Sequence, residues 1–216
     1  GPAFAKVPFA LPTIAAYAME TAIEEGKHVK FLQGALGTKA VSMPNINLFD
    51  SFNTLATAAG IGAAFNPFAS DANFLIGAYI FEDVGVSAYH GAAGLITDKV
   101  NILPAAVGIH AVEAYHAGLV RTSINALDAG TGTLNALTQK ISAARSSLAN
   151  PSGATTTTFI GTKADDIGLT TTMVDLNGAK GSAAFTSATI VDCDVNATGW
   201  SRTTTQVLAI VTGGST

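Results

Sequence analysis

Two short motifs place an imidazole three residues after a carboxylate. They are Glu25-Gly-Lys-His28 and Glu113-Ala-Tyr-His116. On a helix, positions i and i+3 share a face, so each pair directs a carboxylate oxygen and an imidazole nitrogen toward one point. With 4 His and only five Glu in 216 residues, random placement would give about 0.1 such matches. Mixed carboxylate and imidazole donors suit Fe, Mn or Zn.

A third carboxylate, Glu82, interrupts the strongly apolar stretch 73–93. Burying an unpaired carboxylate costs several kcal/mol, so such a group is normally paired or bound to a metal. Helical bundles that bind two iron or manganese ions combine single Glu residues from two helices with Glu-x-x-His motifs from two others. We therefore expect a metal site that contains Glu25, His28, Glu82, Glu113 and His116.

A simpler interpretation of the same residues remains open. In this interpretation Glu24 and Glu25 lie on an exposed helix face in contact with water. His28 and His116 then cap a helix or fill space in the core. The apolar register of residues 14–36 favours burial of Glu25, which lies within the stripe. Glu24 lies about 100° away on the helix and is expected to face solvent. His90 and His110 follow no such Glu and are expected to be surface or packing residues.

The elements that would position these residues are helices. Apolar periodicity predicts helices over 14–36, 51–59, 71–93, 104–125, 133–148 and 206–211. We expect Thr13 and Asp71 to act as N-caps, and Ser201 or Thr203 to begin the last helix. Arg145 is expected to face solvent, and Arg121 to oppose the dipole at a helix C-terminus.

The predicted fold class is mainly α. A helical bundle over residues 1–150 would be followed by a Thr-, Ser- and Gly-rich extension over 151–216, which packs on the bundle as loops and short strands. At 48% hydrophobic, the chain can bury one substantial core. No run of about 18 apolar residues lacks a charge, so no transmembrane segment is expected. The single Cys193 excludes an intrachain disulfide.

The charge of the chain restricts its partners and setting. Only 12% of the residues are charged, and the formal net charge is −4. The chain therefore lacks the excess of basic residues that binds nucleic acid, so no nucleic-acid partner is expected. Thr, Ser and Asn must supply much of the polar surface, which favours an extracellular or cell-wall setting. Asn196-Ala-Thr198 is then a glycosylation site in a protein secreted by a eukaryote.

Four stretches together resemble the ferritin-like desiccation-related family, which includes plant and algal desiccation-related proteins and fungal stress-induced proteins. They are Glu25-x-x-His28-Val29, Phe81–Ala93, Ala111–Arg121 and Ser201–Leu208. The resemblance is specific over 73–125 and loose over 151–200. It implies a four-helix ferritin-like core with a wrapping tail, often in exported proteins, and a stress-associated role without an established reaction.

One departure from this family concerns its first helix. Members begin with a Glu-bearing helix before the one that matches 14–36, and that helix is missing here. Without that helix, the bundle would have an open apolar groove, and its metal site would have one carboxylate ligand fewer than in the family. A partner segment or another copy in a homo-oligomer would fill the groove; the helix at 133–148 is a substitute that lacks Glu.

Two functions follow as hypotheses. The first is a ferritin-like, stress- or desiccation-associated exported protein with a carboxylate and histidine metal site. The second is an extracellular structural protein that self-assembles into a filament or wall layer and uses the bundle without catalysis. A hydrolase is disfavoured, because the sequence contains no Gly-x-Ser-x-Gly elbow and no Cys/His pairing. No residue is assigned a catalytic role.

Overall fold

The computed structural model describes residues 5–151, 166–170, 190–194 and 196–214. Within these ranges the chain is mainly helical. The α-helices are α1 Pro12–Leu36, α2 Asp50–Ala58, α3 Asp71–Ala93, α4 Ile102–Asp128, α5 Thr133–Ala149 and α6 Thr204–Val211, and a short 3-10 helix, η1 Gly37–Lys39, follows α1.

The described residues confirm the prediction of a mainly α fold. Their only β-type pairing is an isolated antiparallel bridge between Cys193 and Gly199. Most of the loops and short strands expected over 151–200 lie outside the described residues. No helix in the described part of the chain combines the length and the apolar character needed to cross a membrane.

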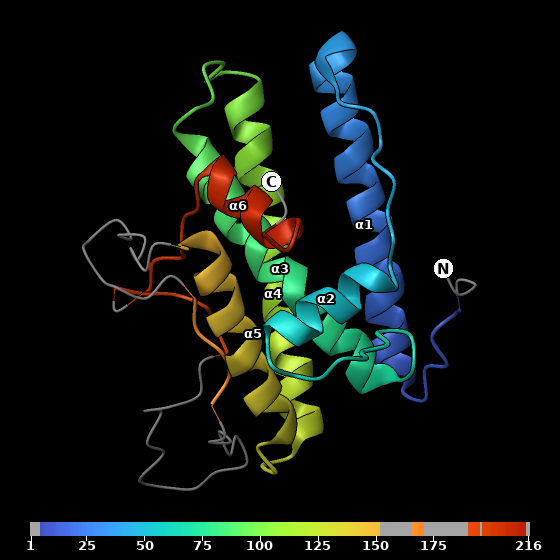
Figure 1. Ribbon diagram of the computed structural model, residues 1–216. Helices are drawn as coiled ribbons and strands as arrows, with labels where there is room; N and C mark the ends of the chain where they lie inside the picture. The colour runs from blue at the N-terminus through green and yellow to red at the C-terminus, as the bar shows by residue number, and fades with distance from the viewer. Residues whose placement is uncertain (1–4, 152–165, 171–189, 195, 215–216) are drawn as a thin grey trace, which may run out of the picture.

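Helices α3 and α4 form an antiparallel pair at the centre of the molecule (Figure 1). Their facing sides are apolar and supply most of the main core. Buried core residues from this pair are Leu75, Ile76, Tyr79, Ile80, Val120 and Ile124. Burial of a large apolar side chain contributes about 1.5–3 kcal/mol. The pair is therefore the rigid frame to which the other elements attach.

The start of α3 corrects two predictions about helix caps. Ser70, not Asp71, is the N-cap of α3, and its hydroxyl accepts from the Asn73 backbone N–H. The Asp71 carboxylate instead accepts from the backbone N–H groups of Ala10 and Leu11, at 2.9 and 3.2 Å. Leu11, not Thr13, is the N-cap of α1. A carboxylate from a distant helix therefore satisfies backbone donors at the N-terminal end of α1.

Helices α5 and α6 cover one side of the central pair. α5 packs on α3 and α4, and α6 packs on α3 and α5 (Figure 1). Thr203 caps α6 through a reciprocal pair of hydrogen bonds with Gln206, as predicted for Thr203. Leu169, Trp200 and Ile210 are each at most 3% exposed. These described parts of the C-terminal segment contribute to the core.

Helix α1 is attached to the rest of the protein more loosely than the other long helices (Figure 1). Only Ile14 among its 25 residues is buried. Its main helix partner is α4. The side of α1 that faces α4 carries Glu25 and His28, so a loosely attached helix supplies part of the predicted site.

Candidate metal centre

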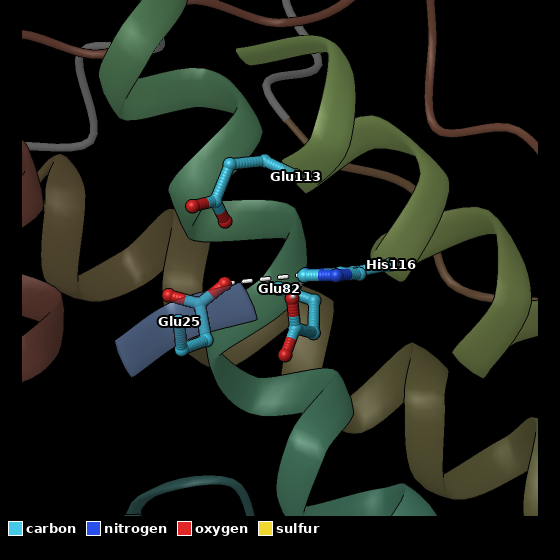
Figure 2. A group of neighbouring side chains, drawn as sticks. All are labelled: Glu25, Glu82, Glu113 and His116. Atoms are coloured by element: carbon cyan, nitrogen blue, oxygen red, sulfur yellow. Dashed lines mark ion pairs between the residues drawn. The ribbon is translucent and has the colours of Figure 1, made fainter. Parts of the chain in front are cut away.

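The five residues predicted to form a site come together from three helices. α1 supplies Glu25 and His28, α3 supplies Glu82, and α4 supplies Glu113 and His116. Figure 2 shows the side chains of four of them directed toward one another. One ligand atom from each of these four, Glu25, Glu82, Glu113 and His116, lies within 4.8 Å of all the others.

Two imidazole nitrogens face the carboxylates at the centre of the cluster. His116 Nδ1 lies 3.2 Å from Glu25 Oε1 and 3.5 Å from Glu82 Oε2. His28 Nδ1 lies 3.3 Å from Glu25 Oε1 and 3.4 Å from Glu113 Oε1. His28 therefore borders the group of four. Charge-assisted hydrogen bonds between nitrogen and oxygen are usually about 2.7–2.9 Å long, so these contacts are loose.

The hydrogen bonding of these buried atoms indicates whether the residues fit a metal ion. Glu25 Oε1, His28 Nδ1 and His116 Nδ1 are buried, and none of them makes a hydrogen bond of good geometry. Buried polar atoms are nearly always satisfied, so three such atoms in one place require an explanation. Donor atoms of these types, directed at a shared space, fit a transition-metal ion.

Gly85 makes room for one of the carboxylates. It lies on α3, and a Cβ atom at this position would overlap Glu113 Oε2. Any other residue would force Glu113 or the helix to move. A glycine inside a helix costs about 1 kcal/mol relative to alanine, and the space for Glu113 gives a physical reason for this cost.

The charges of the cluster shift the pKa values of its members strongly. Burial, together with the nearby carboxylates of Glu25 and Glu82, raises the pKa of Glu113 to about 8. Contacts with Glu25, Glu82 and Glu24 raise the pKa of His116 to about 11. Pairing with His116 lowers the pKa of Glu25. The imidazolium of His116 is thus the main positive charge among these carboxylates, and a metal ion could take its place.

Glu24 was expected to face solvent, and with a side chain 34% exposed it does so only in part. Glu24 Oε2 lies 2.7 Å from His116 Nε2. Glu24 and Glu25 lie on two sides of the α1 face that packs on α4, so both reach the same imidazole. Because the carboxylate of Glu24 accepts from Nε2, Nδ1 is left to face the cluster. This arrangement orients metal-binding histidines in many proteins.

A groove opens beside the cluster, with a volume of about 330 Å³. Three carboxylates, Glu25, Glu82 and Glu113, line it together with apolar side chains. The apolar part consists of Phe81, Val84, Ala88, Val207 and Val211. The cluster is therefore accessible to small molecules along an apolar path. Helix α5, which was considered as a substitute for the first helix of the family, contributes no lining residue to this groove.

A second buried cluster was not predicted, and it corrects the expectations for Arg121 and Arg145. Arg121 and Arg145 both bind Asp83 Oδ2, at 2.9 and 3.0 Å. Arg145 and Arg202 bind Asp166, at 2.6 and 2.9 Å. Arg145 is only 2% exposed, although it was expected to face solvent.

This arginine–aspartate network joins the C-terminal segment to the central helices. Burial alone would raise the pKa of Asp166, but Arg145 and Arg202 lower it below its ordinary value. The sequence did contain a signal: Arg145 lies four residues after Ile141, on the apolar stripe of its helix. Because each carboxylate is matched by guanidinium groups, we assign this network a structural role.

The other predicted residues lie outside the candidate metal centre. His90 and His110 have ring centroids 6.0 Å apart, and His90 Nδ1 lies 3.1 Å from the Trp200 carbonyl oxygen. This agrees with a packing role for His90. Asn196 is exposed, and its side chain contacts Asp194 at 3.4 Å. Its glycosylation stays a prediction.

Comparison with known proteins gives one match. A family model described as "Ferritin-like domain" matches residues 4–126, which include all the residues of the candidate metal centre and Glu24. Comparisons with curated proteins and with solved structures gave no match.

Proposed function

The chain belongs to the ferritin-like domain family, and we propose that it binds one or two transition-metal ions in its helical bundle. The ligands in this proposal are Glu25, His28, Glu82, Glu113 and His116. One observation carries it: ligand atoms of Glu25, Glu82, Glu113 and His116, from three helices, lie within 4.8 Å of one another. The buried, poorly satisfied nitrogens of His28 and His116 support the same conclusion.

The donor set suits Fe, Mn or Zn without selecting one of them. A redox-active ion held here with an open coordination position would be able to take up oxygen species, and the groove provides access. The protein residues have separate roles in this proposal. The three glutamates balance the charge of the ion, the histidines complete its coordination, and Glu24 orients His116.

Elemental analysis of protein purified without chelator tests the proposal. We expect about one or two equivalents of Fe, Mn or Zn per chain, and loss of most of this metal in His116→Ala. His110→Ala is the matched control, because it removes an imidazole from the same helix outside the cluster, and it should retain the metal. A folded wild-type protein that neither carries nor takes up any of these metals would refute the proposal.

We further propose that the protein is exported and associated with stress or desiccation. The resemblance of residues 73–125 to desiccation-related proteins supports this role, and the low content of charged residues supports an extracellular or cell-wall setting. Fractionation of the source cells, with and without dehydration, tests both parts. We expect the protein in the wall or medium, at higher abundance after drying.

A second candidate function is that of an extracellular structural protein. The exposed apolar side chains of α1 favour it, among them Met19 at 63% and Val29 at 53% exposure. A protein of this kind would form filaments or layers without requiring metal. Electron microscopy of metal-free protein distinguishes the two: ordered assemblies would favour the scaffold, and dispersed particles would count against it.

A further inference from the structure

We propose that α1 is a docking surface for α1 of a second copy of this chain, and that the two helices pack antiparallel. Two independent features of α1 support this pairing: an apolar stripe that nothing in the described structure covers, and a division of charge along its length. The proposal does not depend on metal binding.

The first feature is a second apolar stripe on α1. The face toward α4 includes Ile14, Glu25 and His28, but another stripe lies on the exposed side of the helix. Its members recur in steps of three and four: Met19, Ala22, Ile23, Gly26 and Val29. Met19, Ile23 and Val29 are each more than half exposed. A helix with apolar residues on two faces normally packs against a neighbour on each.

The stripe is part of a larger set of exposed apolar side chains. From Met19 to Val29 it takes up about 15 Å of the helix. With a width of about 10 Å it covers about 150 Å². Contiguous apolar patches of a few hundred Å² on a soluble protein mark interaction surfaces, so the stripe alone is smaller than such a patch. The segment after α1 adds further exposed apolar side chains, Val41, Met43 and Ile46.

The second feature identifies the occupant as another copy of α1. The acidic residues of the helix, Glu20, Glu24 and Glu25, all precede its lysines along the chain, and Glu20 is exposed. The basic residues lie in its C-terminal half, where Lys27 and Lys30 are exposed. When two such helices run antiparallel, the acidic half of each lies beside the basic half of the other. In the register that places Glu20 opposite Lys30, the same ion pair forms twice by symmetry.

The pairing also gives α1 the support that a single chain does not provide. A helix in water depends on packing of its apolar face for most of its stability. Here α1 packs mainly on α4, and this contact includes the charged residues of the metal cluster. A second copy would bury the free stripe. It would also hold Glu24, Glu25 and His28 in place against α4.

The mass of the protein in solution is the first test. Light scattering at tens of micromolar should give twice the chain mass of 21.8 kDa, because a symmetric pair closes on itself. A mass of one chain would overturn the proposal. Met19→Glu with Ile23→Glu should give a folded monomer by circular dichroism, while Val191→Glu, an exposed apolar control outside α1, should remain a dimer.

Charge reversal tests the register. Glu20→Lys and Lys30→Glu should each weaken the dimer, by about tenfold in Kd, because each places like charges opposite one another twice. The double variant should recover the wild-type Kd. Lys140→Glu is the control for the change in net charge, since Lys140 is exposed on α5. Failure of the double variant to recover would overturn the antiparallel register.

Cross-linking tests the direction even if the reversals disturb folding. Gly26 and Gly34 both lie on α1, and a Cβ atom added at either position would meet no atom of another element within 4 Å. In this register the two copies of position 26 are about 3 Å apart along the helix axis, and those of position 34 about 27 Å apart. With Cys193→Ser as background, a short bis-maleimide should join Gly26→Cys into a dimer but leave Gly34→Cys unjoined. Joining of both, or of neither, would overturn the proposal.

Discussion

The carboxylate of Glu24 and the imidazole of His116 meet at 2.7 Å, between Oε2 and Nε2. The contact joins α1 to α4 and fixes which nitrogen of His116 faces the other carboxylates. A residue that the helical register directs toward solvent therefore orients one of the proposed ligands.

Glu24→Gln tests this orienting role. The amide can still accept a hydrogen bond from Nε2, but it lacks the negative charge that strengthens the donor power of the other nitrogen toward a metal. We expect metal affinity to fall about tenfold. Glu25→Gln, which changes a ligand itself, should reduce affinity more. Calorimetric titration with Mn²⁺ or Zn²⁺ measures both. Equal affinities for Glu24→Gln and wild type would contradict the role of Glu24.

Gly85→Ala should disrupt the site, because the added methyl group occupies the space of the Glu113 carboxylate. The new Cβ would overlap Glu113 Oε2, so the carboxylate must turn away from the cluster. We expect metal affinity to fall about 10- to 100-fold. Gly108→Ala is the matched control, because Gly108 is a helical glycine with open space around its Cβ position. It should keep wild-type affinity and gain about 1 kcal/mol in stability.

The pH dependence of stability should reveal Glu113 in the metal-free protein. Its pKa rises from 4.5 to about 8 on folding. Between these values the folded protein holds a proton that the unfolded chain has released, so stability falls as pH rises. The side chain introduced by Glu113→Gln cannot ionise. This contribution to the fall in stability is therefore absent from the variant. We expect the metal-free variant to be more stable than wild type at pH 8, by about 2 to 4 kcal/mol.

Urea unfolding of both proteins between about pH 4.5 and 8 measures the Glu113 effect, because the other groups contribute similarly to each. The same variant should bind metal more weakly. A stability difference that does not change with pH would show that the pKa of Glu113 does not rise on folding.

Arg145→Leu should destabilise the protein strongly. Arg145 is buried against Asp83 and Asp166, and its removal leaves both carboxylates with less compensation. We expect a loss of about 3 to 5 kcal/mol in the free energy of unfolding. Lys140→Leu, an exposed position on the same helix, should change stability by less than about 0.5 kcal/mol. Similar losses in the two variants would contradict a structural role for the network.

The helices and the side chains that gather at the candidate metal centre were predictable because both follow local rules. Apolar periodicity located the helices, and the Glu-x-x-His spacing identified residues that share a face. The cap of α3 was less certain, since Ser70 and Asp71 are both good capping residues. Only the tertiary structure shows that Asp71 binds the backbone before α1 instead.

The arginine–aspartate network could not be derived in the same way. Its partners, Asp83, Arg145 and Asp166, are far apart in sequence, and no local spacing connects them. The position of Arg145 on an apolar stripe indicated burial, but the compensating carboxylates were visible only after folding. The contact of Glu24 with His116 was missed for a related reason: a helical wheel gives the direction of a side chain, not the reach of a flexible one around a neighbouring ring.

Anomalous X-ray diffraction from crystals of the protein, purified without chelator, tests the central claim most directly. We predict a strong peak at the absorption edge of Fe, Mn or Zn, within bonding distance of Glu25, Glu82, Glu113 and His116. An occupied metal position elsewhere, or crystals of protein exposed to all three metals that show no peak among these side chains, would contradict it.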